Sequence, residues 1–258
     1  MKKATEASYH NEHIRKHGCY EVHPNEEYLR ILRGSGILNE EHNLTLDVGC
    51  GSGAFGLRLA CLGSPVVGID ISSDSIRIAR KMAKEQGLDA EFIVGDIEKM
   101  PFRDEAFYLV FCGFVLHHVP NLLCQVAQQI YCILKEGGKL FMCEPNAHSP
   151  SAIIQYNFGK SRTPNEKPLN PKKLAILLST LGFAETESED IGDVKHLETD
   201  SPTRFRKIVR LIVAETLSAV NKIPFVPGPY FTMRSAKKSG LQKKYVTRTA
   251  QFWSIWNL

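Results

Sequence analysis

The stretch LDVGCGSGAFG, residues 46–56, constrains the fold of this chain more than any other feature. Four glycines fall within the eight positions 49–56, directly after a short apolar run that includes Asp47 and Val48. Glycine lets bare backbone approach a ligand, and the N–H groups at the start of a helix can face that ligand. The stretch therefore predicts a ligand-binding turn between a buried strand and a helix.

Apolar runs and helical patterns alternate along the rest of the chain. The expected strands cover residues 44–49, 65–70, 90–96, 107–113 and 139–145, and the helices between them cover 55–63, 73–87 and 121–138. A further helix at 170–183 precedes expected strands at 184–193 and 228–238. This alternation predicts one α/β domain with a Rossmann-like, doubly wound, mostly parallel sheet that carries helices on both faces.

Local signals mark the ends of the three inner helices. Ser73 or Asp74 is expected to cap the start of the helix at 73–87, because both side chains accept hydrogen bonds from a helix N-terminus. Gly63, Gly87 and Gly137 are expected at the helix ends, where glycine adopts positive φ at little cost.

The cysteines bear on the cellular compartment. All seven are scattered and lack Cys-x-x-Cys spacing, which argues against a disulfide framework or a zinc knuckle and favours a reducing cytoplasm. No secretory signal is expected at the start of the chain. Residues 106–134 lack Asp, Glu, Lys and Arg, but histidines, a proline and glutamines interrupt them, which favours a buried strand and helix over a membrane span.

The glycine turn belongs to one of several ligand-binding types. A phosphate-binding P-loop is excluded because no Gly-Lys-Ser/Thr follows. Gly51, Gly53 and Gly56 have the spacing of the G-x-G-x-x-G dinucleotide fingerprint, and Asp70 ends the second expected strand where a ribose-binding acid belongs. An NAD(P)-dependent oxidoreductase therefore stays open as an alternative at this point.

Five segments narrow the choice: LDVGCGSGAFGLRLA, VVGIDIS, GDIEKMPF, FVLHHVPN and LKEGGKLFMCEP, in this order between residues 44 and 145. They resemble the class I S-adenosylmethionine-dependent methyltransferases, in the small-molecule branch that includes the ubiquinone and menaquinone methyltransferases (methyltransferase type 11 domain). The resemblance implies S-adenosylmethionine as cofactor, S-adenosylhomocysteine as product and an antiparallel seventh strand. It places this domain at residues 41–238, after a helical lid at 1–40 and before a C-terminal tail at 239–258.

The same resemblance assigns roles at the cofactor site. Glycines matching Gly49, Gly51 and Gly53 approach the aminoacyl group of the cofactor, and an acid matching Asp70 binds both ribose hydroxyls. An acid matching Asp96 takes the adenine amino group, and the residue matching Cys112, where the fourth strand ends, contacts the methionine moiety through its backbone. The expected cofactor-binding residues are Asp47, Gly49, Cys50, Gly51, Gly53, Asp70, Ile71, Asp96, Ile97 and Cys112. Tyr108 departs from the aspartate that the family often has there.

Methyl transfer to a hydroxyl or an acidic carbon needs alignment of the acceptor and a group that takes its proton. His117 and His118 follow the fourth strand at the ligand-binding end of the sheet, and His117 is the preferred general base. Packing of either histidine at a helix start is the competing interpretation. Glu144 and Asn146 are further candidate acceptor contacts, and residues 144–170 and 191–227 are expected to build the acceptor pocket.

Charge is distributed unevenly along the chain. Residues 202–258 carry 11 Lys and Arg against one acid, Glu215. An expected helix at 203–220 joins an apolar stripe to the cations of residues 204–210, which indicates a lipid-like acceptor or a peripheral membrane contact. A non-catalytic methyltransferase-like module that binds nucleic acid is a less favoured alternative. The sequence gives neither the acceptor nor the oligomeric state.

The N-terminal segment contains several histidines. His10, His13 and His17 are spaced at i, i+3 and i+7, with His23 nearby, a set that would suit a metal ion if the segment were helical. A lid helix over the cofactor is the favoured interpretation, and no metal site is expected.

Overall fold

The computed structural model describes residues 3–17, 43–158, 166–191 and 230–238. Its strands are β1 (Thr45–Val48), β2 (Val66–Asp70), β3 (Ala90–Val94), β4 (Phe107–Gly113), β5 (Leu134–Pro145), β6 (Phe183–Ile191) and β7 (Tyr230–Lys237). Its α-helices are α1 (Lys3–His17), α3 (Ala54–Cys61), α4 (Ser73–Gln86), α5 (Leu123–Ile133), α6 (Pro150–Phe158) and α7 (Pro171–Thr180). Short 3₁₀ helices are η1 (Ile97–Lys99), η2 (Leu116–His118) and η3 (Pro120–Leu122).

All seven strands form one sheet in the order β3-β2-β1-β4-β5-β7-β6. The pairs from β3 to β5 are parallel, whereas β7 runs antiparallel to both β5 and β6. The expected doubly wound sheet with an antiparallel last strand is therefore confirmed. The strand order reverses between β1 and β4, and in open α/β sheets ligands bind beyond the carboxyl ends of the strands at that point.

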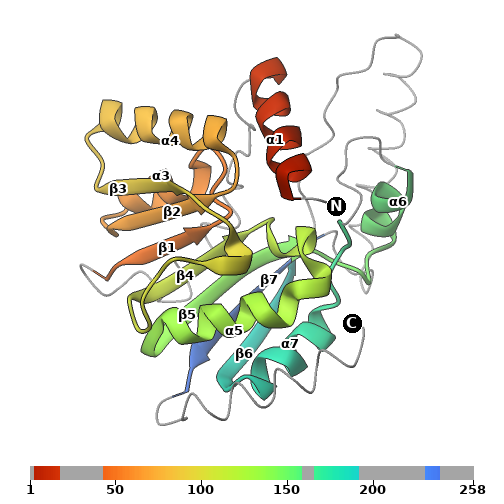
Figure 1. The fold of residues 1–258 in the computed structure, drawn as a ribbon. Coiled ribbons are helices and arrows are strands. Elements are labelled where there is room, and N and C mark those ends of the chain that lie inside the picture. Colours follow the sequence, from red (N-terminus) through yellow and green to blue (C-terminus); the bar gives the residue numbers. More distant parts are fainter. Residues whose placement is uncertain (1–2, 18–42, 159–165, 192–229, 239–258) are drawn as a thin grey trace.

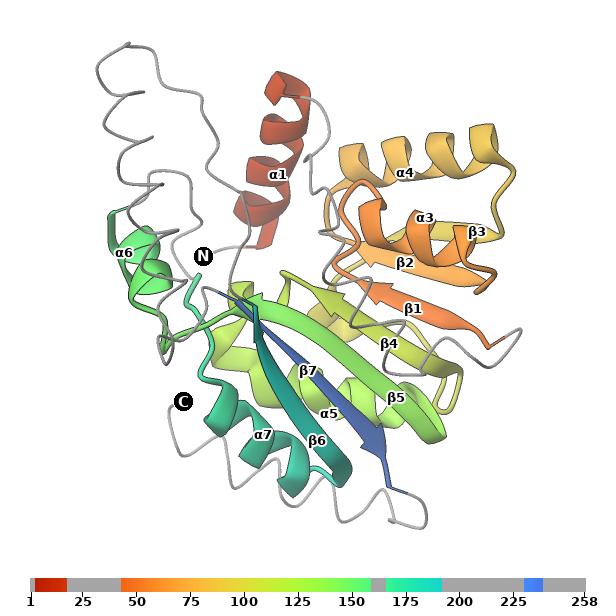
Figure 2. The same cartoon turned by 180° about the vertical axis from the view of Figure 1, so that it is seen from behind.

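Helices cover both faces of this sheet. In Figure 1, α5 and α7 lie in front of β4 to β6, and the view from behind in Figure 2 shows α3 over β1 and β2. The largest apolar cluster fills the α5 and α7 face, with Phe107, Ile130 and Leu177 among its fully buried members. A second cluster packs Phe55 and Leu59 of α3 against Phe111 and Phe141. Both faces are thus buried, as the continuous apolar strands predict.

Two local expectations about the helices were wrong. Ser72 caps α4, because its Oγ accepts a hydrogen bond from the backbone N–H of Ser75 at 3.1 Å, while Ser73 is exposed. Gly137 does not end α5, which stops at Ile133; it lies inside β5 with φ 70°, next to the register shift between β4 and β5. Gly87 does cap α4 in the left-handed conformation, and Gly63 follows the end of α3 with φ 92°.

Several expected features lie outside the described residues. They are the basic helix at 203–220 with residues 204–210, most of the insertion at 191–227, and the tail at 239–258. Within the described part of the chain, none of the helices has the length and apolar character needed to cross a membrane.

Ser72→Ala is expected to destabilise the protein by about 1 to 2 kcal/mol, because the fully buried Ser72 both caps α4 and donates a hydrogen bond to Asn11 Oδ1 of α1 at 2.8 Å. Urea unfolding monitored by circular dichroism measures this difference. Ser73→Ala is the matched control and should change stability by less than about 0.5 kcal/mol. Equal losses in the two variants would contradict the assignment of the cap.

Candidate active site

The glycine turn after β1 adopts left-handed conformations, with φ of 67° at Gly49, 51° at Gly51 and 87° at Gly53. A Cβ atom at Gly49 would lie 2.2 Å from Val115 Cγ2, so packing alone requires glycine there. A Cβ atom at Gly51 would meet no described atom within 4 Å. Gly51 therefore offers bare backbone toward open space, as an approaching ligand requires.

The backbone N–H groups of this turn are bonded within the chain. Gly49 and Cys50 both donate to Ile69 O, at 2.8 and 3.1 Å, and Gly53 donates to Cys50 O at 2.8 Å. Gly51 donates to Asp70 Oδ2 and Gly56 to Asp47 Oδ2, each at 2.9 Å. Because these donors are already used and two carboxylates face the turn, the arrangement suits a ligand that carries no phosphate here.

Asp47 lies at the end of β1 and is 2% exposed. Burial raises the pKa of its carboxyl group to about 7, and the hydrogen bond from Gly56 opposes this rise. Asp47 was named among the cofactor-binding residues, and the structure shows it bonding the backbone of the turn. Its side chain is buried and contacts the turn through the hydrogen bond from Gly56.

Asp70 ends β2 and accepts two backbone hydrogen bonds, from Gly51 to Oδ2 at 2.9 Å and from Ser72 to Oδ1 at 2.8 Å. Burial raises the pKa of Asp70, whereas these two bonds and the nearby His10 lower it. Each carboxylate oxygen has two lone pairs, so both oxygens retain the capacity to accept a further hydroxyl. Ile71 lies between these residues and is half-buried.

Asp96 begins η1, and its Oδ1 accepts a hydrogen bond from Glu98 N at 2.9 Å. Gln129 of α5 holds the same segment: its Oε1 accepts from Met100 N at 2.9 Å and its Nε2 donates to Glu98 O at 2.8 Å. Ile97, Met100 and Phe102 pack against the main apolar cluster as partly buried side chains. Asp96, which the resemblance assigns to the adenine, thus has three partly buried apolar side chains close to it in the sequence.

A buried hydrogen bond between a histidine and a glutamate follows β4. Glu144 of β5 is fully buried, and its Oε2 lies 2.8 Å from His117 Nδ1. The same carboxylate accepts backbone hydrogen bonds from Val115, Leu116 and His117, at 3.1, 2.8 and 3.3 Å. Glu144 was expected to contact the acceptor, but these bonds make it the group that orients His117.

Other residues named from the sequence are buried without facing the turn. Cys112 is inside β4 and fully buried, paired with Val48 on one side and Met142 on the other. The thiol of Cys50 is buried too, and burial raises the pKa of both thiols. Asn146 is 1% exposed and donates to Asp190 Oδ1 at 3.1 Å, which leaves it holding β6 rather than lining an open pocket.

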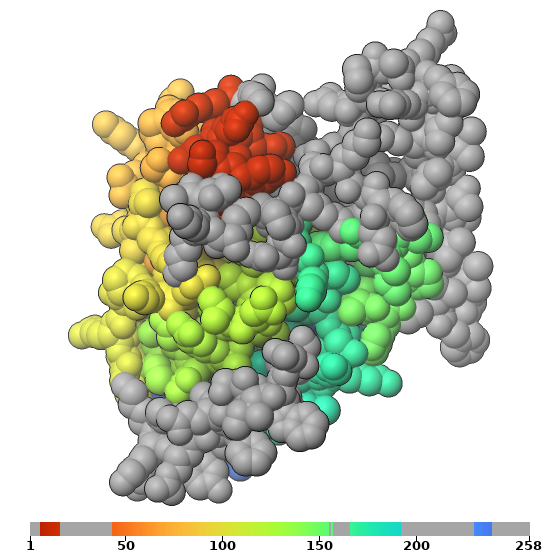
Figure 3. All heavy atoms as spheres, turned by 45° about the vertical axis from the view of Figure 1, so that its right-hand side comes forward, coloured from red at the N-terminus to blue at the C-terminus, as the bar shows by residue number. Residues whose placement is uncertain are grey.

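The N-terminal helix α1 lies over the carboxyl ends of the strands. Both views of the ribbon place it between α4 and α6, and Figure 3 shows its red atoms directly against α4. Asn11 Oδ1 accepts from Ser72 Oγ at 2.8 Å and from Asp74 N at 3.1 Å, and Arg15 Nε lies 2.8 Å from Asp74 Oδ2. The sequence does not reveal these contacts, because only the fold brings residue 11 beside residue 72.

The electrostatic neighbours of α1 connect the separate parts of the site. Burial lowers the pKa of His10. The nearby Asp70 and Glu166 act to raise this pKa, and His117 acts to lower it. Burial raises the pKa of Glu6, and the nearby carboxylates of Glu98, Glu166 and Asp96 raise it further. The helix thus lies close to the predicted ribose acid, the predicted adenine acid and the candidate base together.

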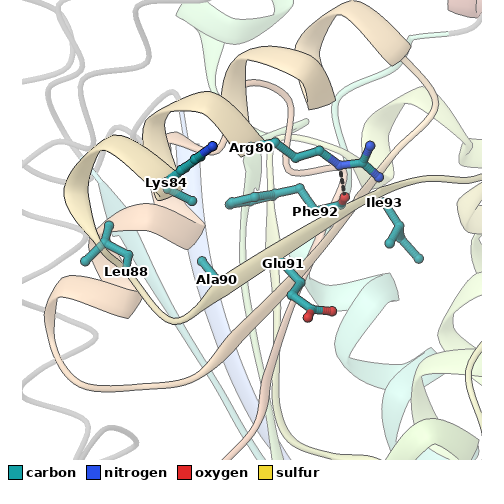
Figure 4. A pocket seen from close by; sticks show the side chains of 8 residues that line it. Arg80, Lys84, Leu88, Ala90, Glu91, Phe92 and Ile93 are labelled. Carbon is teal, nitrogen blue, oxygen red and sulfur yellow. Dashed lines mark hydrogen bonds between the residues drawn. The ribbon is translucent and has the colours of Figure 1, made fainter.

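A separate groove of about 350 Å³ lies beside α4 and the edge strand β3, lined by Arg80, Ala83, Lys84, Leu88 and residues 90–93 (Figure 4). Arg80 Nε donates to Phe92 O across it at 2.7 Å. None of the expected cofactor-binding or catalytic residues lines this groove, so it is distinct from the candidate site.

Comparison with known proteins places the chain in a family. Residues 39–204 match the methyltransferase domain family, and the chain belongs to this family. A demethylmenaquinone methyltransferase from Lactococcus lactis subsp. lactis is 30% identical over 157 residues, 59% of this chain and 61% of that protein. A ubiquinone biosynthesis O-methyltransferase from Coxiella burnetii is 35% identical over 118 residues, 46% of this chain and 49% of that protein. The matched segments thus span about half to three fifths of these curated relatives.

Solved structures share the fold. An S-adenosylmethionine-dependent methyltransferase from Archaeoglobus fulgidus superposes with a TM-score of 0.59 at 20% identity, covering 81% of this chain and 92% of that chain. A sarcosine dimethylglycine methyltransferase assigned in Galdieria sulphuraria gives 0.65 at 16% identity, covering 87% and 88%. The cyclase SpnF gives 0.61 at 22% identity, covering 83% and 82%. At these identities the likeness defines the fold alone.

These findings confirm the family expected from the sequence, the class I S-adenosylmethionine-dependent methyltransferases, and S-adenosylmethionine as its cofactor. They also decide against the nicotinamide dinucleotide alternative.

Asp47→Asn is expected to weaken the pH dependence of stability. The pKa is about 7 in the folded chain and near 3.8 in the unfolded chain, so between these values only the folded chain keeps the proton. Stability is then greatest below pH 4, falls as the pH rises toward 7, and is constant above it. Between pH 5 and pH 8, ionisation of Asp47 should lower the free energy of unfolding of the wild type by about 2 to 3 kcal/mol. The Asn variant cannot ionise at this position and should not show this decrease.

Urea unfolding of both proteins at pH 5, 6, 7 and 8 measures this effect. Asp89→Asn, a change at an exposed acid, is the control and should keep the wild-type pH dependence. Parallel curves for wild type and Asp47→Asn would contradict the raised pKa.

Proposed function

We propose that this protein transfers a methyl group from S-adenosylmethionine to a small-molecule acceptor of the quinone type, with His117 as the general base. The observation that carries the proposal is that the glycine turn and the His117–Glu144 pair both follow strands at the point where the strand order reverses, between β1 and β4. A glycine turn whose donors are taken up by Asp47 and Asp70 lies beside a histidine whose ring is fixed by a buried glutamate. The quinone-methyltransferase names of the relatives support this acceptor class.

The residues present fit the cofactor. Gly51 has space beside its Cα atom, and Asp70 can accept two hydroxyl donors while it keeps its bonds to Gly51 and Ser72. The N–H groups of Gly49, Cys50, Gly51, Gly53 and Gly56 are already bonded, which suits a cofactor without a pyrophosphate. Asp96 and Ile97 are proposed to hold the adenine, and the backbone near Cys112 the methionine moiety.

When bound, the cofactor would supply a methyl group carried on a sulfonium sulfur. The acceptor would attack the methyl carbon in line with the carbon–sulfur bond, and S-adenosylhomocysteine would leave. His117 would take the acceptor's proton. Glu144 accepts the hydrogen bond of Nδ1, which leaves Nε2 as the basic nitrogen and stabilises the imidazolium once it forms. The three backbone bonds to Glu144 keep this carboxylate in place as the charge on the ring changes.

The remaining parts of the chain receive finer assignments. We propose that α1 forms a lid over the cofactor, a role supported by its contacts with Ser72 and Asp74. Residues 144–170 and 191–227 are proposed to enclose the acceptor. The cations of residues 204–210 support contact with a lipid-like acceptor or an anionic membrane surface on the cytoplasmic side.

Asp70→Asn is expected to weaken binding of S-adenosylhomocysteine by about 10- to 100-fold, because it removes a charge-assisted bond to the ribose. Calorimetry measures the dissociation constant. Asp89→Asn is the matched control: it removes the same charge at an exposed position outside the candidate site and should leave affinity within about 3-fold. Unchanged affinity in Asp70→Asn would remove Asp70 from the cofactor site.

His117→Gln is expected to lower kcat for methylation of a demethylated quinol by about 100-fold or more, with affinity for S-adenosylhomocysteine nearly unchanged. His118→Gln distinguishes the two neighbouring histidines. A full loss of turnover in His118→Gln together with normal turnover in His117→Gln would show that the neighbour is the base.

A further inference from the structure

Histidine and acidic side chains from three separate segments meet beside the candidate base. Glu6 and His10 of α1 and His118 of η2 place one potential ligand atom each within 4.8 Å of one another. His117, His118 and Glu166 form a second group of the same kind. His118 belongs to both groups, so it is the centre of the cluster.

His118 Nδ1 lies 3.3 Å from Glu166 Oε1 and 3.7 Å from Glu6 Oε1. This nitrogen is buried and has no hydrogen-bond partner among the residues that the structure describes. Burial lowers the pKa of His118 well below its usual value, and the nearby His117 and His10 lower it further. A buried nitrogen left unbonded beside two carboxylates costs free energy that a bound cation would recover.

The distances fit a metal ion better than they fit hydrogen bonds. A tetrahedral ion with bonds of about 2.0 to 2.1 Å to nitrogen and oxygen holds its ligand atoms about 3.3 Å apart. The separations of 3.3 and 3.7 Å from His118 Nδ1 are close to this value. Glu6 and His10 are four residues apart on α1, a spacing that places two ligands on one helix face.

The local charge also favours a cation. Burial raises the pKa of Glu6 most, and Glu98, Glu166 and Asp96 raise it further, so several acids accumulate around this end of α1. A divalent ion bound here would attract these carboxylates and so offset the repulsion between them. Two imidazole ligands favour a transition metal over Mg²⁺ or Ca²⁺, which prefer oxygen ligands alone.

We infer that Glu6, His10 and His118 form a binding site for a divalent transition-metal ion of the Zn²⁺ type, which fastens α1 to the carboxyl end of β4, with the carboxylate of Glu166 close to His118. The sequence did not predict this site, because the spacing of its histidines grouped His10 with His13 and His17, whereas the fold places His10 against His118, 108 residues away in the chain. The inference does not depend on methyl transfer or on the identity of the acceptor.

The bound ion would complete the attachment of α1. Asn11 and Arg15 already bond the C-terminal half of this helix to Ser72 and Asp74. Glu6 and His10 belong to its N-terminal half, so the ion would fix the half that lies nearest to His117 and Glu166.

The test is Zn²⁺ binding to the full-length protein after removal of metal by dialysis against a chelator. Titration in competition with a chromophoric chelator gives the dissociation constant, and Co²⁺ as a substitute gives the intense visible absorption of a four-coordinate site. We expect one ion per chain. His10→Gln and His118→Gln should each raise the dissociation constant by at least about 100-fold, since loss of outer-shell partners alone costs 10- to 100-fold.

His13→Gln is the matched control on the same helix and should bind Zn²⁺ within about 2-fold of wild type. Circular dichroism checks the fold of each variant, and Glu6→Gln on α1 replaces His118→Gln if that buried change prevents folding. The inference is overturned if the wild type binds no Zn²⁺ below about 10 μM. Wild-type affinity in His10→Gln would also overturn it, as would an equal loss in His13→Gln, which would place the ion on the helix histidines alone.

Discussion

Two buried carboxylates hold the glycine turn, and the geometry of the rest of the site depends on them. Asp47 at the end of β1 bonds Gly56, and Asp70 at the end of β2 bonds both Gly51 and Ser72. Because the N–H groups of Gly51 and Gly56 already donate to carboxylates, they are not available to a phosphate, and the two acids favour neutral or cationic groups beside the turn. A glycine-rich turn is therefore defined as much by what occupies its donors as by its glycines.

Glu144 plays the corresponding part on the other side of the switch point. Phe114 has a left-handed φ of 56°, which turns the chain sharply after β4 and directs the next three backbone N–H groups at one carboxylate. Burying a carboxylate is costly, but four hydrogen bonds to it offset much of that cost. The orientation of His117 thus depends on a strand that begins well after it in the sequence, and on the pairing of β4 with β5.

These two cases explain how much the sequence could predict. Buried parallel strands are continuous apolar runs, so β1 to β4 were located to within one or two residues, and Gly87 marked the end of α4. The cap at Ser72, the role of Glu144 and the position of α1 depend on contacts between distant segments: Asn11 with Ser72, and His117 with Glu144. No local pattern encodes such pairs. The short helix α6 was not predicted; it begins at Pro150, inside the segment 144–170 that was expected to build the acceptor pocket.

The charges around the site connect the proposed cofactor with the inferred metal ion. Asp70 acts on His10, and His10 belongs to the cluster with Glu6 and His118. Carboxylates predominate at this edge of the sheet, and burial lowers the pKa of His10 and of His118, which suits both a sulfonium and a divalent cation. Since both ligands act on groups that interact through His10, each should change the affinity for the other by the same factor, as thermodynamic linkage requires. The helix α1 would then be the element through which the two sites are coupled.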